Sequence, residues 1–142
     1  MKKILVDTNI VIDLLAKREQ FYREAQELFT LADEKIISVF VSSISLINTH
    51  YILSKNISSE ETRKILIKFK VLSKVLPLED KILDLALASD FSDFEDAVQY
   101  YSAIDNKLDA IVTRNKKDYK TSEIPVFTAR EFVDKYLSGE NF

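Results

Sequence analysis

The chain has 142 residues, 46% of them hydrophobic, so it can bury one substantial core but not two ordinary ones, and we expect a single domain over residues 1–142. Its formal net charge of −3 argues against a protein that coats nucleic acid through bulk positive charge. Because it has no cysteine and only one histidine, thiolate sites are excluded and a zinc site would be poor, which leaves oxygen ligands for any metal.

The first half of the chain alternates between strand and helix patterns. Lys2 to Val6 is a short apolar run of the kind that forms a strand buried on both faces, and it ends at Asp7. This run is too short for a signal peptide and no later run could span a bilayer, so we expect a soluble, cytoplasmic protein. The next predicted elements are helices over residues 8–15 and 21–32, a strand over 36–41, and a helix over 44–52 capped by Ser42-Ser43.

The second half continues the alternation. Ser58 and Glu61 fit a capping box that opens a helix reaching residue 72. Residues 75–78 fit only an edge strand, because Pro77 cannot donate to a central ladder. The remaining predicted elements are helices over residues 79–88 and 93–104, strands over 110–113 and 125–127, and a last helix that opens with the capping box of residues 128–131.

Strands that alternate with helices predict an α/β fold with right-handed parallel crossovers and a sheet covered on both faces. In such sheets, ligands bind beyond the carboxyl ends of the strands. Asp7, the start of the helix at Asp93 and the loop after Thr113 would all lie at that edge. Acids that are distant in the sequence are therefore expected to converge there.

Three positions carry acids that fit either a site or ordinary helix and turn chemistry. Asp7 follows a buried strand, where an ionised carboxylate needs a partner, a cation or solvent, but it also fits an N-cap. Asp93 suits an N-cap, whereas Asp96 shares a helix side with Tyr100 and is compatible with an acid that points toward the sheet edge. Asp118 also fits an ordinary turn acid among lysines.

Two further groups of polar residues are ambiguous. Asn48 shares a helix face with the apolar Ile44, Tyr51 and Ile52, which would draw it inward, as a hydrogen-bonded core residue or as a weak neutral oxygen ligand. The basic residues beside Asp118 have a solvated loop as their default interpretation. If Asp118 belongs to a site, they are placed to hold an RNA backbone through its phosphates; they are Arg114, Lys116 and Lys117.

Carboxylates gathered at one strand edge would repel one another, so a divalent cation would tend to neutralise them. All-oxygen ligation selects Mg²⁺, Mn²⁺ or Ca²⁺ over zinc or copper. Ions of this kind support phosphodiester hydrolysis without a cysteine, histidine or lysine.

At this point the motifs resemble those of a known family. Leu5 to Asn9 resembles the opening strand of PIN domains, Asp93 to Ala97 their third acidic motif, and Thr113 to Tyr119 their fourth. The resemblance implies a three-layer α/β/α fold with a central, mostly parallel sheet. It also implies a Mg²⁺- or Mn²⁺-dependent ribonuclease, most often the VapC-like toxin of a toxin–antitoxin pair, with a cognate antitoxin as partner and a homodimer as the frequent assembly.

Carried over residue by residue, the resemblance makes Asp7, Asp96 and Asp118 metal-site acids, with Thr8, Asp93 and Asn115 as supporting neighbours. The clearest departure is Asn48, because the family usually places a glutamate in this helix. One negative charge fewer should weaken metal binding. The alternative is therefore a PIN-fold module with weakened catalysis that binds RNA or a protein partner.

Overall fold

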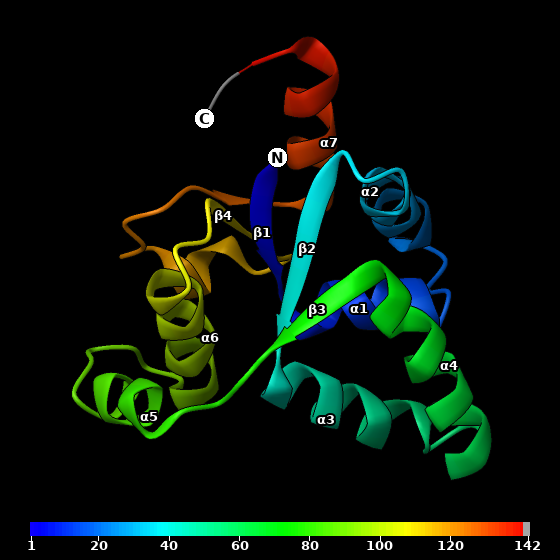
Figure 1. Ribbon diagram of the computed structural model, residues 1–142, viewed down its shortest axis with the longest axis horizontal. Coiled ribbons are helices and arrows are strands. Elements are labelled where there is room, and N and C mark those ends of the chain that lie inside the picture. The colour runs from blue at the N-terminus through cyan, green and yellow to red at the C-terminus, as the bar shows by residue number, and fades with distance from the viewer. Residues whose placement is uncertain (141–142) are drawn as a thin grey trace.

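The protein is built on a five-stranded parallel sheet, seen in a computed structural model that describes residues 1–140. The strand order is β3-β2-β1-β4-β5, and all four pairings are parallel. The strands are β1 Lys2–Val6, β2 Ile37–Ser42, β3 Ser73–Leu76, β4 Ala110–Val112 and β5 Val126–Phe127. The first strand therefore lies at the centre of the sheet, and its carboxyl end lies beside those of its neighbours (Figure 1).

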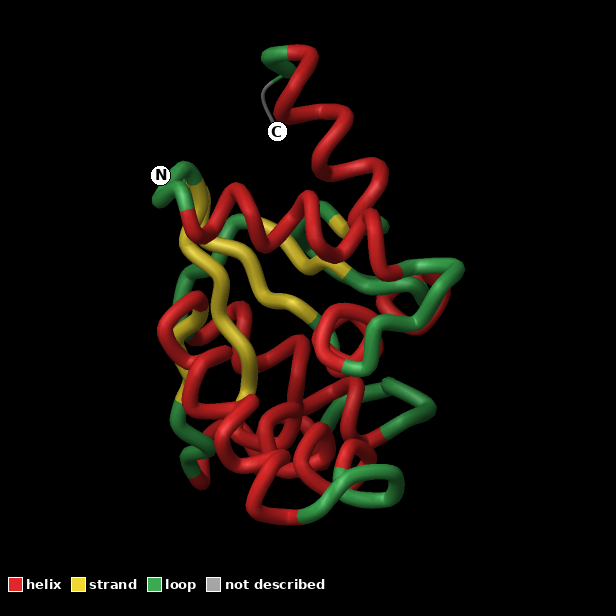
Figure 2. Tube along the Cα trace, turned by 90° about the vertical axis from the view of Figure 1, so that its right-hand side faces the viewer, coloured by secondary structure: helices red, strands yellow, loops and turns green. Residues whose placement is uncertain are grey.

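Helices connect the strands and cover both faces of the sheet (Figures 1 and 2). They are α1 Thr8–Leu15, α2 Tyr22–Asp33, α3 Ser43–Leu53, α4 Ser59–Leu72, α5 Asp80–Leu87, α6 Phe94–Asp105 and α7 Ala129–Ser138. Among residues 1–140, no helix is both long and apolar enough to cross a membrane.

The alternation of side chains along β1 explains the three layers. Ile4 belongs to a buried cluster that includes Leu28 of α2 and Phe132 of α7. Leu5 points the other way, into a second cluster that includes Ala103 of α6 and Ile111 of β4. Because both faces of the central strand are buried, the run reads as uninterrupted hydrophobic sequence. The predicted α/β/α fold with a parallel sheet is confirmed.

The predicted strands and helices are present, with three differences in detail. Strand β3 begins at Ser73, directly after α4, and ends before Pro77, so the predicted strand over 75–78 was two residues late. It is an edge strand, as expected. Ser58 caps α4 by accepting the Glu61 N–H, but no reciprocal bond from the Glu61 side chain accompanies it, unlike the complete capping box at the start of α7. The loop after β4 contains a 3₁₀ turn, η1 Lys116–Tyr119.

Candidate functional site

Asp7 lies at the carboxyl end of β1, where its carboxylate accepts four hydrogen bonds although only 8% of the residue is exposed. Its Oδ1 accepts from the backbone N–H of Thr8 (2.8 Å) and from Nε2 of Gln99 (3.1 Å). Its Oδ2 accepts from the hydroxyls of Thr113 (2.8 Å) and Tyr119 (3.2 Å). The predicted helix cap is therefore present, and the same carboxylate is also fixed by side chains from three other parts of the chain.

The other predicted acids lie near this carboxylate, whose charge acts on Asp96. Asp93 caps α6 and accepts the backbone N–H of Asp96 at 2.9 Å. Asp93, Asp96 and Asp118 line one pocket of about 260 Å³, which Lys117 and Lys120 also line.

The acids are close enough to act on one another electrostatically. Partial burial, as the largest cause, and the negative charges of acidic neighbours together raise the pKa of Asp96 to about 7; these neighbours are Asp93, Asp7, Asp118 and Glu95. Burial, together with the charge of Asp7, also raises the pKa of Tyr119. A proton or a cation at this edge would relieve the repulsion between the acids.

The donor set fits a hydrated divalent cation. Within residues 1–140, no three acidic, histidine or cysteine side chains form a ready-made ligand cluster. Mg²⁺ does not require one, because it keeps several waters and is usually held by one or two carboxylates. The oxygen donors and the repulsion at Asp96 suit such an ion. In addition, Oε1 of the buried Gln99 has no hydrogen-bond partner among the described residues, so this oxygen can still accept a hydrogen bond.

Asn48 does not point into the core, and that expectation was wrong. The buried residues of α3 are the small polar Ser45 and Thr49 and, at the end of the helix, Leu53. The apolar Tyr51, expected on the inner face, is 66% exposed. Asn48 is half-buried, and its Nδ2 donates to Oε1 of Glu95 in α6 at 2.7 Å. The helix is apolar on several sides, so its hydrophobic pattern did not identify the face that packs.

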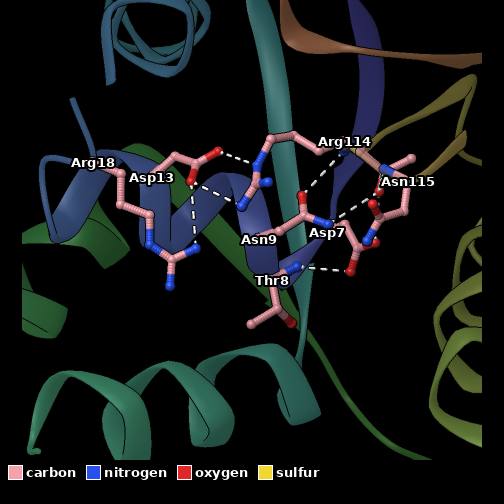
Figure 3. A network of polar contacts seen from close by, with 8 residues as sticks. Asp7, Thr8, Asn9, Asp13, Arg18, Arg114 and Asn115 are labelled. Atoms are coloured by element: carbon pink, nitrogen blue, oxygen red, sulfur yellow. Dashed lines mark hydrogen bonds and ion pairs between the residues drawn. The ribbon is translucent and has the colours of Figure 1, made fainter. Parts of the chain in front are cut away.

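Arg114 is held by a second polar network, shown in Figure 3. Its guanidinium donates to both carboxylate oxygens of Asp13, at 2.8 and 3.3 Å, and lies 4.1 Å from the ring centroid of Phe21. Its backbone N–H donates to Oδ1 of Asn9 at 3.2 Å. The Asp13 side chain is 1% exposed and also lies 3.7 Å from Arg18. Arg114 therefore ties the loop after β4 to α1.

The remaining predicted residues have different surroundings. Lys116 pairs with Glu131 of α7 at 3.0 Å, whereas Lys117 lines the acidic pocket. The backbone N–H of Asn115 donates to the Thr113 hydroxyl, which itself donates to Asp7. The Thr8 hydroxyl lies 2.7 Å from that of Ser45. Contacts of Arg114, Lys116 and Lys117 with RNA stay predictions.

Sequence reasoning missed several residues of this site. Gln99 and Tyr119 are both 1% exposed and both bond to Asp7. Gln99, four positions after Glu95, is itself a polar residue among apolar neighbours. This pattern could have indicated a buried, hydrogen-bonded side chain. Asp13 offered a similar one, because it interrupts the apolar run of α1.

Comparison with known proteins supports the predicted resemblance. The sequence profile of the PIN domain matches residues 3–117. A search of curated proteins found no significant match. Among solved structures, a toxin–antitoxin complex from Klebsiella pneumoniae is 25% identical, with a TM-score of 0.66 over 89% of this chain and 97% of that one.

Two more distant structures share the fold. The DNA-bound VapBC of Salmonella typhimurium is 20% identical, with a TM-score of 0.68 over 91% of this chain and 99% of that chain. VapC20 of Mycobacterium tuberculosis, described as a toxin that cleaves the Sarcin-Ricin loop, is 17% identical, with a TM-score of 0.60 over 76% of this chain and 86% of that one.

Proposed function

The chain belongs to the PIN domain family, and from that premise we propose that it is a metal-dependent endoribonuclease that hydrolyses RNA phosphodiester bonds as the toxin of a toxin–antitoxin pair. One observation carries the proposal: acids from β1, α6 and the loop after β4 meet at the carboxyl edge of the sheet. This proximity is supported by the pKa of Asp96, which the negative charges of Asp7 and Asp118 help to raise. Mg²⁺ or Mn²⁺ suits this donor set.

The residues at the carboxyl edge of the sheet would have different roles. Asp7, Asp96 and Asp118 would hold the cation, and the four donors to Asp7 orient its carboxylate. Because the pKa of Asp96 is raised to about 7, its carboxyl group is partly protonated near neutral pH. It must release this proton before it can act as a ligand. A bound cation supplies positive charge that offsets the charge on the phosphate in the transition state. Lys117, which lines the same pocket, is placed to contact a phosphate.

The proposal includes a protein partner. The Klebsiella structure is a toxin–antitoxin complex, which supports a cognate antitoxin for this chain as well. Helices α3 and α4 present large apolar side chains to solvent, each between 66% and 84% exposed: Ile47, Tyr51, Ile67 and Val71. Surfaces of this kind are typical of interaction sites, so an antitoxin or a second copy in a homodimer would have apolar area to bury. As an RNA-cutting toxin, the protein would act in the cytoplasm.

The test is cleavage of a labelled structured RNA by purified protein with Mn²⁺ or Mg²⁺. We expect cutting that EDTA abolishes and that Asp7→Asn and Asp96→Asn each reduce by at least about a hundredfold, as is typical when transition-state charge stabilisation is lost. Asp33→Asn, which changes an exposed acid of α2, is the matched control and should cut like the wild type. Metal-independent cutting, or equal cutting by Asp7→Asn, would contradict the proposal.

Asn48 favours a second candidate, a PIN-fold module with weakened catalysis that binds RNA or a protein partner. On this hypothesis, the purified protein retains RNA in a binding assay but cuts no substrate with either metal. Expression in a bacterial host separates the two candidates further. Toxicity that Asp7→Asn relieves supports the nuclease, whereas equal growth with both proteins supports the binding module.

A further inference from the structure

Two hydrogen-bonded contacts join α3 to α6 beside the acidic edge. Nε2 of Gln99 donates to the Ser45 hydroxyl at 2.7 Å, and Nδ2 of Asn48 donates to Oε1 of Glu95 at 2.7 Å. Ser45 and Asn48 are three residues apart, and Glu95 and Gln99 are four apart, so each pair lies along one side of its helix. The four side chains therefore form one line of contact between the two helices.

This line leads directly to Asp7. The same Nε2 of Gln99 that contacts Ser45 also donates to Oδ1 of Asp7 at 3.1 Å. Glu95 precedes Gln99 by about 6 Å along the helix axis and lies in the first turn of α6. Its carboxylate is thereby on the side of α6 that faces α3, one turn from the residue that contacts Asp7. It is also next in sequence to Asp96.

Exposure agrees with this placement. Glu95 lies at the surface, where a hydrated cation can reach its carboxylate. The buried Gln99, one turn away, has an Oε1 atom without a hydrogen-bond partner among residues 1–140, so a polar group can still be accommodated beside this line.

We propose that Glu95, held in place by the Asn48 amide, contributes to the cation site the carboxylate that α3 lacks. The proposal rests on the proposed nuclease function and concerns the ligands of its site. Asn48 is then a positioning residue that donates to the acid. The negative charge absent from position 48 is present in the site, but it comes from α6.

A simpler role for the Asn48–Glu95 contact is a tie between two helices, and it makes a different prediction. A tie contributes to the stability of the protein without metal. A ligand contributes to the affinity for the cation. Glu95→Gln separates the two roles, because the Gln side chain has the same shape and its Oε1 can still accept from Asn48, while the charge is lost.

The experiment measures Mn²⁺ affinity by isothermal titration calorimetry, without any RNA. We expect Glu95→Gln to weaken binding by about tenfold or more and Asn48→Ala to weaken it less, in the range seen when groups that support a metal site are removed. Glu61→Gln is the matched control, because Glu61 is an exposed glutamate in the first turn of α4. It should bind Mn²⁺ like the wild type. Circular dichroism checks that each variant is folded.

A double variant tests the position of the charge. Asn48→Glu combined with Glu95→Gln returns a carboxylate to α3 and should recover most of the affinity lost in Glu95→Gln. Equal Mn²⁺ affinity in the wild type, Glu95→Gln and Glu61→Gln overturns the inference and leaves the nuclease proposal intact. If neither the wild type nor Glu61→Gln binds Mn²⁺, the metal-dependent function fails, and the inference fails with it.

Discussion

Asp7 combines a structural and an electrostatic role in one carboxylate. As N-cap it receives the Thr8 N–H, and three side-chain donors fill the remaining directions around its oxygens. An ionised carboxylate has about four acceptor directions, so this one is fully used within the protein. A cation that binds Asp7 must therefore share an oxygen with a donor. The longest of the four bonds, 3.2 Å from the Tyr119 hydroxyl, is the one we expect to yield most readily.

Asp96 makes the stability of the metal-free protein depend on pH. Its pKa is about 7 in the folded protein and 3.8 for the free side chain, so the folded state binds more protons between these values. The contribution of Asp96 to the free energy of unfolding is therefore largest below about pH 4, and it is lost as the pH rises through about 7. Unfolding by urea in EDTA at several pH values measures the slope.

Asp96→Asn should reduce this pH dependence. We expect the Asn variant to be more stable than the wild type at pH 8, because it carries no charge among the other acids, and to lose that advantage at pH 5. Some slope should remain, because the pKa of Glu95 is raised as well. The same slope in both proteins would show that Asp96 is not the group responsible. Asp33→Asn serves as the control for removal of an exposed acid.

At the scale of elements, the sequence predicted what depends on neighbours along the chain. The strand that ends at Asp7 and the helices capped by Ser42, Asp93 and Thr128 are all local patterns, and each was found. The proximity of the site acids was predicted from the same elements, because parallel strands bring their carboxyl ends to one edge of the sheet.

The side of a helix that meets another helix was much harder to predict. Helix α3 has apolar residues around its circumference, so the pattern placed Tyr51 inside, whereas the structure exposes it. Glu95 and Gln99 were overlooked because their partners, Asn48 and Ser45, are 47 and 54 residues away. Contacts at that separation are decided by packing between elements, and a single sequence carries little information about them.

The ion pair between Asp13 and Arg114 holds the loop after β4 against α1. Asp13→Asn leaves the Arg114 guanidinium, whose side chain is only 28% exposed, without its anionic partner. We expect a loss of about 3 kcal/mol in the free energy of unfolding, because removing one partner of a buried ion pair costs far more than the pair contributes. Urea unfolding measures this loss. Hydrogen exchange should also become faster at the backbone N–H of Arg114 and of its neighbours in the loop.

Arg18 provides the comparison for that prediction. It approaches the same carboxylate at 3.7 Å, but 43% of its side chain is exposed. Arg18→Ala should therefore cost no more than about 1 kcal/mol, as exposed ion pairs do. Similar losses for Asp13→Asn and Arg18→Ala would mean that Arg114 does not depend on the buried acid.

The fold of the whole molecule gathers acids at the sheet edge in a way that suits a cation. The net charge is only −3, yet acids from distant segments meet at one end of the central strand. The sheet order explains the meeting, because β1 and β4 are neighbours and α6 leads directly into β4. The fold stabilises this concentration of charge through its packing, and a cation would stabilise it further.

Mn²⁺ should therefore raise the melting temperature of the protein, and more so at pH 8 than at pH 5.5. At a concentration of about 100 times the dissociation constant, binding to the folded state alone adds about 2.7 kcal/mol, which corresponds to a rise of several degrees. The rise should be smaller at pH 5.5, because Asp96, with a pKa of about 7, retains its proton and competes with the cation. Thermal unfolding with Mn²⁺ and with EDTA measures both effects. Asp7→Asn should lose most of the rise at either pH, whereas Asp33→Asn should keep it. An increase that is the same at both pH values, or the same in Asp7→Asn, would place the bound cation away from these acids.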